Sequence, residues 1–238
     1  MHTLDRLKHM IPDQAWAADA RPLMFLDLKL GNICNLKCRI CGSWSSSTFA
    51  AEELANLGPN EDRKSNHHYH MLRAGAWPRE NPTFWQEIEQ VSDQIRYIEF
   101  TGGEPFMIQE HFDLLQGLVD RGLASQIEIH YNTNGTQLPS MKIFWMWSQF
   151  KNVEIAFSID DTEAAFEYQR HPAKWDMVKN NLKEFGIRST QTGNIDFQIC
   201  STINIFNILS LDKLLYWVKE YNPKYFHVNT LFAPDCFN

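Results

Sequence analysis

Six short apolar segments alternate with helix-forming segments along this chain of 238 residues, and the alternation strongly constrains the fold. Strands separated by helical spacers pair in parallel, so the pattern predicts an α/β protein with a six-stranded parallel sheet. No Gly-x-Gly-x-x-Gly turn follows the first strand, which argues against a dinucleotide-binding fold. The expected strands are residues 24–30, 96–101, 126–132, 153–159, 195–203 and 224–229, and the expected helices are residues 45–57, 84–94, 109–122, 140–150, 173–185 and 209–220.

Apolar and polar residues alternate within each expected strand, whereas buried parallel strands are usually apolar on both faces. Because the crossover helices need an apolar face to pack on, we expect the polar face to line the interior of a partial (β/α)6 TIM-like barrel. The alternative is a sheet with one face in solvent, which is more usual in antiparallel proteins. Unpaired buried carboxylates are costly, so some inward groups must pair, be protonated or await a cationic partner. The charged residues on this face are Asp27, Lys29, Glu99, Glu128, His130 and Glu154.

Length and composition indicate one core domain at residues 23–238, preceded by a lead-in at residues 1–22. Residues 58–83 are expected to form a loop or insertion, and Trp145 and Trp147 to belong to the core. The net charge of −7 argues against nucleic acid as a general partner. The absence of an apolar run of membrane-spanning length and of a signal-peptide pattern predicts a cytoplasmic protein without a membrane partner.

Three cysteines fall within eight residues, in the run Cys34-Asn-Leu-Lys-Cys38-Arg-Ile-Cys41. Three thiolates on one loop can hold three corners of a [4Fe–4S] cluster, which usually takes four cysteines and would here keep one iron open. One alternative is a zinc site completed by His67, His68 or His70. A second alternative is a redox dithiol of Cys38 and Cys41, which leaves Cys34 unexplained.

The second expected strand ends in Gly102-Gly103-Glu104-Pro105. The two glycines allow close approach of the backbone to a ligand, and the proline stiffens the exit. Without the cysteines this segment would be interpreted as an ordinary turn.

Together these two motifs, each placed after a strand, resemble the signature of radical S-adenosylmethionine (radical SAM) enzymes. The resemblance implies that Cys34, Cys38 and Cys41 bind a [4Fe–4S] cluster whose open iron binds S-adenosyl-L-methionine. It implies reductive cleavage to a 5′-deoxyadenosyl radical, which abstracts a hydrogen atom from a substrate. The cofactor contacts that it implies are Gly102, Gly103, Glu104, Pro105, Ser158, Arg170, Asn134 and Ile40.

The segment from Ser158 to Asp160, with Arg170 downstream, is similar to the branch that carries SPASM or twitch extensions. Auxiliary clusters in that branch use C-terminal cysteines, and Cys236 alone follows residue 204 here. A missing C-terminal extension is therefore part of the expectation. The resemblance implies a peptide or protein side chain as substrate, with a nucleoside or sugar as the alternative, and an external one-electron reductant of flavodoxin or ferredoxin type.

Overall fold

The structure is a computed structural model that describes residues 22–56, 75, 81 and 83–232. The N-terminal lead-in up to residue 21, nearly all of the expected insertion with its three histidines, and Cys236 lie outside these residues. The boundaries predicted for the lead-in and the core domain therefore remain predictions.

Six parallel strands form one sheet in the described part of the chain, and their order in the sheet follows their order in the sequence. This arrangement confirms the expected α/β class and the partial (β/α)6 barrel. The strands are β1 (Phe25–Lys29), β2 (Tyr97–Thr101), β3 (Glu128–Thr133), β4 (Asn152–Ser158), β5 (Ile195–Ile203) and β6 (Tyr225–Thr230).

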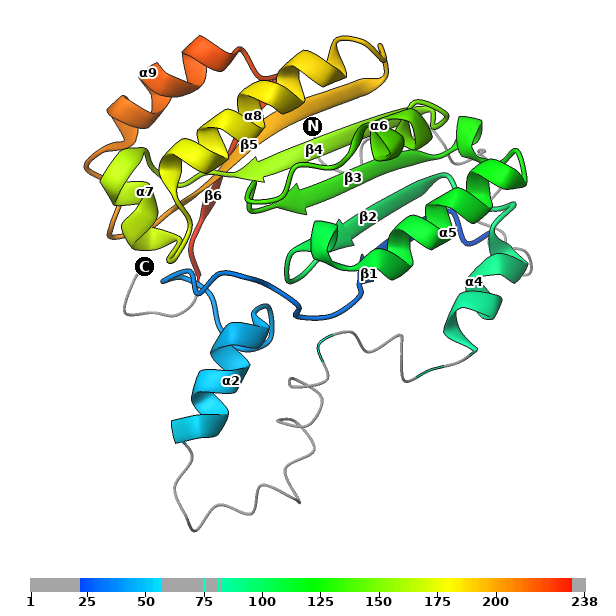
Figure 1. Ribbon diagram of the computed structural model, residues 1–238, viewed down its shortest axis with the longest axis horizontal. Coiled ribbons are helices and arrows are strands. Elements are labelled where there is room, and N and C mark those ends of the chain that lie inside the picture. Colours follow the sequence, from blue (N-terminus) through cyan, green and yellow to red (C-terminus); the bar gives the residue numbers. More distant parts are fainter. Residues whose placement is uncertain (1–21, 57–74, 76–80, 82, 233–238) are drawn as a thin grey trace.

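The expected helices are present, with shifts of a few residues at their ends. They cover one face of the sheet, apart from α2, which projects from the loop after β1 (Figure 1). One additional helix, α7, follows β4 and was not predicted. The helices are α2 (Ser47–Asn56), α4 (Phe84–Val91), α5 (Gln109–Asp120), α6 (Met141–Trp147), α7 (Glu163–Gln169), α8 (Trp175–Ser189) and α9 (Leu211–Tyr221), with short 3-10 turns at η2 (Pro105–Met107) and η3 (Ala124–Gln126).

The strand register separates an apolar face from a polar face. On the helix side, one row crosses five strands through paired positions, and almost every side chain in it is buried. Burial of each such aliphatic side chain contributes about 1.5–3 kcal/mol. The predicted orientation, with apolar side chains toward the helices, is confirmed. The row consists of Leu26, Ile98, Ile129, Val153 and Ile195.

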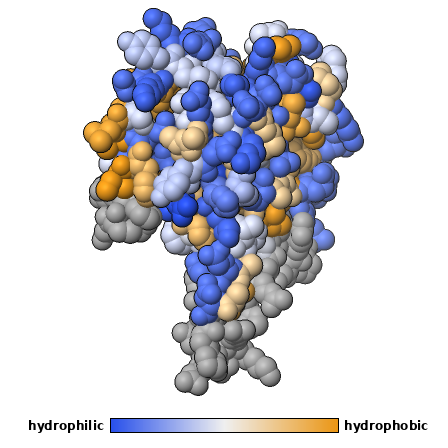
Figure 2. All heavy atoms as spheres, turned by 60° about the vertical axis from the view of Figure 1, so that its left-hand side comes forward, coloured by the Kyte–Doolittle hydropathy of each residue, from blue (hydrophilic) through white to orange (hydrophobic). Residues whose placement is uncertain are grey.

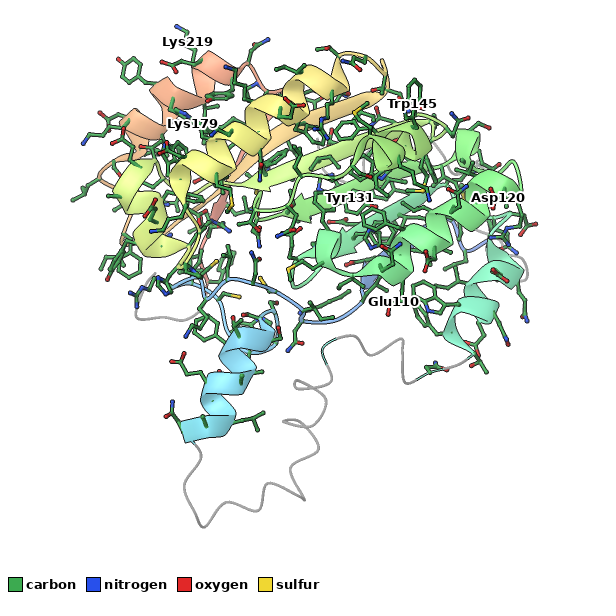
Figure 3. All side chains as sticks on the ribbon, viewed as in Figure 1. Glu110, Asp120, Tyr131, Trp145, Lys179 and Lys219 are labelled. Carbon is green, nitrogen blue, oxygen red and sulfur yellow. The ribbon has the colours of Figure 1, made fainter. Side chains whose placement is uncertain are left out.

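Aromatic rings fill the space between the sheet and the helices α5 and α6. Tyr131 stacks on Phe100 at 4.9 Å between ring centroids and lies 5.4 Å from Trp147. Figure 3 shows Tyr131 between the sheet and α5. Trp147 is fully buried, as expected, but the expectation for Trp145 was wrong because 67% of its surface is exposed. The two tryptophans are two residues apart, which places them on different sides of α6.

The surface of the described residues is mixed in hydropathy, and the projection that contains α2 is mostly hydrophilic in its described atoms (Figure 2). Among the residues that the structure describes, no helix combines the length and the apolar character needed to cross a membrane.

Candidate functional site

The three cysteines lie on the loop between β1 and α2, at the end of the sheet to which the strand arrowheads point (Figure 1). The Cys41 amide donates to the Cys38 carbonyl at 3.0 Å, which closes a turn around Arg39 and Ile40. Backbone hydrogen bonds also tie this loop to the chain after β4. The Lys37 amide donates to the His171 carbonyl at 2.6 Å, and the Arg39 amide donates to the Gln169 carbonyl at 2.7 Å.

All three sulfurs are free thiols in largely enclosed positions. Burial raises the pKa of Cys34 to about 11 and that of Cys38 to about 12, and it also raises the pKa of Cys41. Burial penalises the charged thiolate, so the thiols are protonated at neutral pH unless a metal replaces the proton.

Gly102 and Gly103 bring the backbone after β2 against the cysteine loop. Both have positive φ, +78° and +59°. A Cβ on Gly103 would lie 2.4 Å from the Ile33 carbonyl oxygen, which is backbone and cannot move aside easily. The Glu104 amide donates to that same oxygen at 2.7 Å. A side chain at position 103 would therefore disrupt the contact between the two loops.

Glu104 is fully buried, and its carboxylate accepts three hydrogen bonds. The donors are the Thr133 hydroxyl at 2.8 Å, the Asn134 amide at 2.7 Å and the Phe106 amide at 3.2 Å. Burial raises the pKa of Glu104 to about 7, against these hydrogen bonds, which lower it. The side chain thus holds the loops after β2 and β3 together, a role that the sequence did not predict. Pro105, which follows, is buried in η2.

Asn134 links the loop after β3 to the cysteine loop. Its side-chain nitrogen donates to the Asn35 carboxamide oxygen at 3.1 Å and approaches the Cys34 sulfur at 3.8 Å. The sequence assigned Asn134 to cofactor contact or to turn geometry, and its side-chain oxygen does accept from the Thr136 amide within the turn at 2.9 Å.

Arg170 is buried at the end of α7, and its guanidinium contacts the Asp160 carboxylate at 2.7 Å. Its Nε atom has no hydrogen-bond partner among the described residues. The guanidinium charge acts to lower the pKa of both Cys38 and Cys41, against the larger effect of burial. Arg170 is therefore a buried cation beside the thiols, rather than part of an ion pair on a helix surface.

A cavity of about 430 Å³ opens on the polar face of the sheet. The inward orientation predicted for Glu99, His130 and Glu154 is confirmed, because all three line it. Asp27 lies on the same face, in register with Glu99, but is exposed, and Glu128 pairs with Lys151 at 2.8 Å. Ser158 ends β4 on this face, in register with Cys200, which lines the cavity. The other polar lining residues include Asn132, Gln198, His227 and Asn229.

The thiols do not form a site for a single metal ion. Among the described residues, no three His, Cys, Asp or Glu side chains converge closely enough to hold one. Ligands of a cubic cluster occupy separate corners and need not converge on one point, so this finding does not test the predicted cluster. The histidines of the zinc alternative lie outside the described residues.

The structure brings most of the predicted residues to one end of the sheet. The three cysteines, Asn134, Glu104 and Gly103 are joined through the hydrogen bonds above, and Arg170 reaches the same region from α7. Ile40 is half-buried in the turn between Cys38 and Cys41. Sequence reasoning missed Asp160 as the partner of Arg170, although the pair of aspartates directly after β4 was a visible signal.

Comparison of the sequence with protein-family models and with curated proteins gives no match. Solved structures do resemble the fold. Native anSMEcpe with bound AdoMet matches with a TM-score of 0.61 at 18% identity, covering 90% of this chain and 52% of that one. Its complex with AdoMet and the Kp18Cys peptide gives 0.60 at 18% identity, with 89% and 52% covered. Streptococcus suis SuiB bound to S-adenosylmethionine gives 0.57 at 17% identity, with 90% and 42% covered. This chain therefore spans about half the length of these proteins, and the likeness is one of fold.

Proposed function

We propose that this chain is a radical SAM enzyme. The observation that carries the proposal is the meeting of three enclosed free thiols with a glycine turn and a buried arginine at one end of a partial barrel. Solved structures of the same fold hold S-adenosylmethionine. The SPASM or twitch branch is included in the proposal because anSMEcpe and SuiB match over nearly all of this chain.

Cys34, Cys38 and Cys41 would hold a [4Fe–4S] cluster. When bound, the cluster and S-adenosylmethionine supply a 5′-deoxyadenosyl radical that abstracts hydrogen from the substrate. The protein's part is to stabilise charge at the sulfurs: the Asn134 amide group lies beside Cys34, and the Arg170 cation favours the thiolate of Cys38. Both effects oppose the cost of burying thiolates.

S-adenosylmethionine would be bound by the residues around the thiols. The half-buried backbone of Gly102 and Gly103 offers polar groups without a Cβ. The Arg170 Nε, which has no partner among the described residues, can donate to a carboxylate. Glu104 and Pro105 hold the glycine turn in place, and Asn134, Ser158 and Ile40 complete the proposed contacts. Because three protein donors already occupy the Glu104 carboxylate, any contact of Glu104 with the ligand must share one of these oxygens.

We propose a peptide or protein side chain as substrate, with a small molecule such as a nucleoside or sugar as the alternative. The complex of anSMEcpe with a peptide supports the first choice. An external one-electron reductant of flavodoxin or ferredoxin type and a cytoplasmic location complete the proposal, because clustered thiols of this kind persist in reducing compartments.

Metal analysis after anaerobic reconstitution tests the cluster. The wild-type protein should be brown, with about four irons and four sulfides per chain. Cys34→Ala should lose the colour, whereas Cys200→Ala, which changes a free thiol outside the loop, should keep it. A colourless protein with one zinc per chain would overturn the proposal.

Product analysis tests the reaction. With dithionite and S-adenosylmethionine, the reconstituted protein should form 5′-deoxyadenosine, and Cys34→Ala should form none. Equal yields from the two proteins would show that the product does not arise at this site.

A further inference from the structure

The polar face carries a row of charged groups at one level of the sheet, and three of them line the cavity. Paired positions in the register place one residue of each of five neighbouring strands in this row. Residues paired across parallel strands point to the same side, so the row spans the inner face. Its members are Asp27, Glu99, His130, Glu154 and Asp196.

The row holds more acid than its basic partners balance. Asp196 pairs with Lys224, and Glu154 lies 3.2 Å from the His130 ring. The Asp27 carboxylate accepts a hydrogen bond from the Thr101 hydroxyl at 3.1 Å, and this neutral donor adds no positive charge. Of the other cations on this face, Lys29 donates to Ser45 at 3.2 Å and Lys151 pairs with Glu128.

Glu99 is the least compensated of the lining carboxylates. Burial raises its pKa most, His130 lowers it, the neighbouring Asp27 raises it, and a hydrogen bond with Asn132 lowers it. A cation placed beside Glu99 would relieve both the desolvation and the repulsion from Asp27. An anion at the same place would add a further like charge.

The lining residues of the cavity come from several levels along the strands. Glu154 lies four residues before Ser158 on β4, which corresponds to about 13 Å along the strand at about 3.3 Å per residue. The walls at intermediate height carry the neutral polar side chains of Asn132 and Gln198. The charged row is therefore separated from the carboxyl ends of the strands by neutral polar walls.

We infer that the cavity binds an ammonium or guanidinium group, as in a lysine or arginine side chain, with the charge beside Glu99 and Glu154. This inference rests on the proposed function in one respect, namely that the bound molecule is the substrate. It narrows the substrate class to cationic peptides or amines.

Calorimetry on the anaerobically reconstituted protein with S-adenosylmethionine tests the charge. The probes are Nα-acetyl-lysine methylamide, the arginine analogue, the uncharged norleucine analogue and n-pentylamine. The lysine and arginine probes should bind at least about tenfold more tightly than the norleucine probe. Tight binding of n-pentylamine would assign the site to free amines, and weak binding would assign it to peptide side chains. Equal affinity for lysine and norleucine probes would overturn the inference.

Glu99→Gln tests the residue. It should remove the preference for lysine over norleucine while norleucine binding stays at the wild-type level, which also shows that the variant is folded. Glu220→Gln, which changes an exposed carboxylate on α9, should keep the preference. An unchanged preference in Glu99→Gln would overturn the assignment. Failure of 5′-deoxyadenosine formation, measured separately, would count against the proposed function and leave the cation site standing.

Discussion

The apolar face and the polar face of the sheet are built from adjacent residues on each of five neighbouring strands. The row of Leu26, Ile98, Ile129, Val153 and Ile195 packs against helices, and the next residue of each strand belongs to the charged row. Because side chains alternate between faces, a one-residue slip would exchange a hydrophobic core for carboxylates. The core therefore fixes the register, and the register in turn places the inner side chains.

Two histidines show how differently the faces treat the same side chain. His111 lies on the helix side between aromatic rings, fully buried, with its Nδ1 2.5 Å from the Ile108 carbonyl. His130 lies on the inner side against the Glu154 carboxylate. The first environment favours the neutral ring, whereas the second places the ring beside a carboxylate.

The largest difference in stability loss between a buried and an exposed position should appear on α6. Trp147→Ala should lower the free energy of unfolding by about 3–5 kcal/mol, because it removes a fully buried indole from the aromatic layer. Trp145→Ala, two residues earlier and mostly exposed, should change it by less than about 0.5 kcal/mol. Chemical denaturation measures both, and similar losses in the two variants would contradict the assignment of the faces.

Gly103→Ala tests how tightly the rim is packed. Alanine at positive φ costs about 1 kcal/mol, and the clash with the Ile33 carbonyl should add about 1–3 kcal/mol. Gly122→Ala is the matched control, since it has φ of +72° and no atom within 4 Å of its Cβ position. Equal losses of unfolding free energy in the two variants would show that the loop after β2 does not touch the cysteine loop.

His111, on the helix side of the sheet, should make the stability of the protein sensitive to acid. Burial lowers its pKa to about 3, below the ordinary value of 6.5. The neutral ring therefore makes its full contribution to the free energy of unfolding above pH 6.5, and this contribution falls as the pH decreases toward 3. At pH 5 about 2 kcal/mol of it is lost. His111→Gln should show a shallower fall in unfolding free energy between pH 7 and pH 5. Parallel profiles for wild type and variant would rule out a buried neutral ring.

A small loss of stability is also expected for an ion pair at the polar face. Lys151→Ala removes a half-exposed partner of Glu128 and should cost no more than about 1 kcal/mol. The loss should shrink further when denaturation is repeated at high salt, because salt screens exposed charges. A loss as large as that of Trp147→Ala would mean that ion pairs, and not only the apolar face, stabilise the sheet.

Periodicity was enough to predict the strands, because apolar and polar residues alternate in them and each of the first five is followed by a helix. It failed for Trp145, where a run of aromatic residues around α6 gave no indication of which ones face solvent. It also failed for α7, whose seven residues are too few for a periodic signal and follow two aspartates.

The cysteines and the glycine turn could be found from the sequence because their spacing is local. The triple hydrogen bonding of Glu104 and the pairing of Arg170 with Asp160 could not, because these contacts depend on how separate loops approach one another. The charged row has the same origin: each strand shows a polar residue at that level, but only the register reveals that they are neighbours.

The attachment of the cysteine loop to the chain after β4 has a consequence for synthesis on the ribosome. Arg39 is held through its Nε by the carbonyl of Tyr168, 129 residues later in the chain. While the strands are being made in order, the three thiols therefore leave the ribosome well before the segment that fastens their loop. During that interval they are open to stray metals and oxidants, so the emerging chain needs a reducing environment more than the folded protein does.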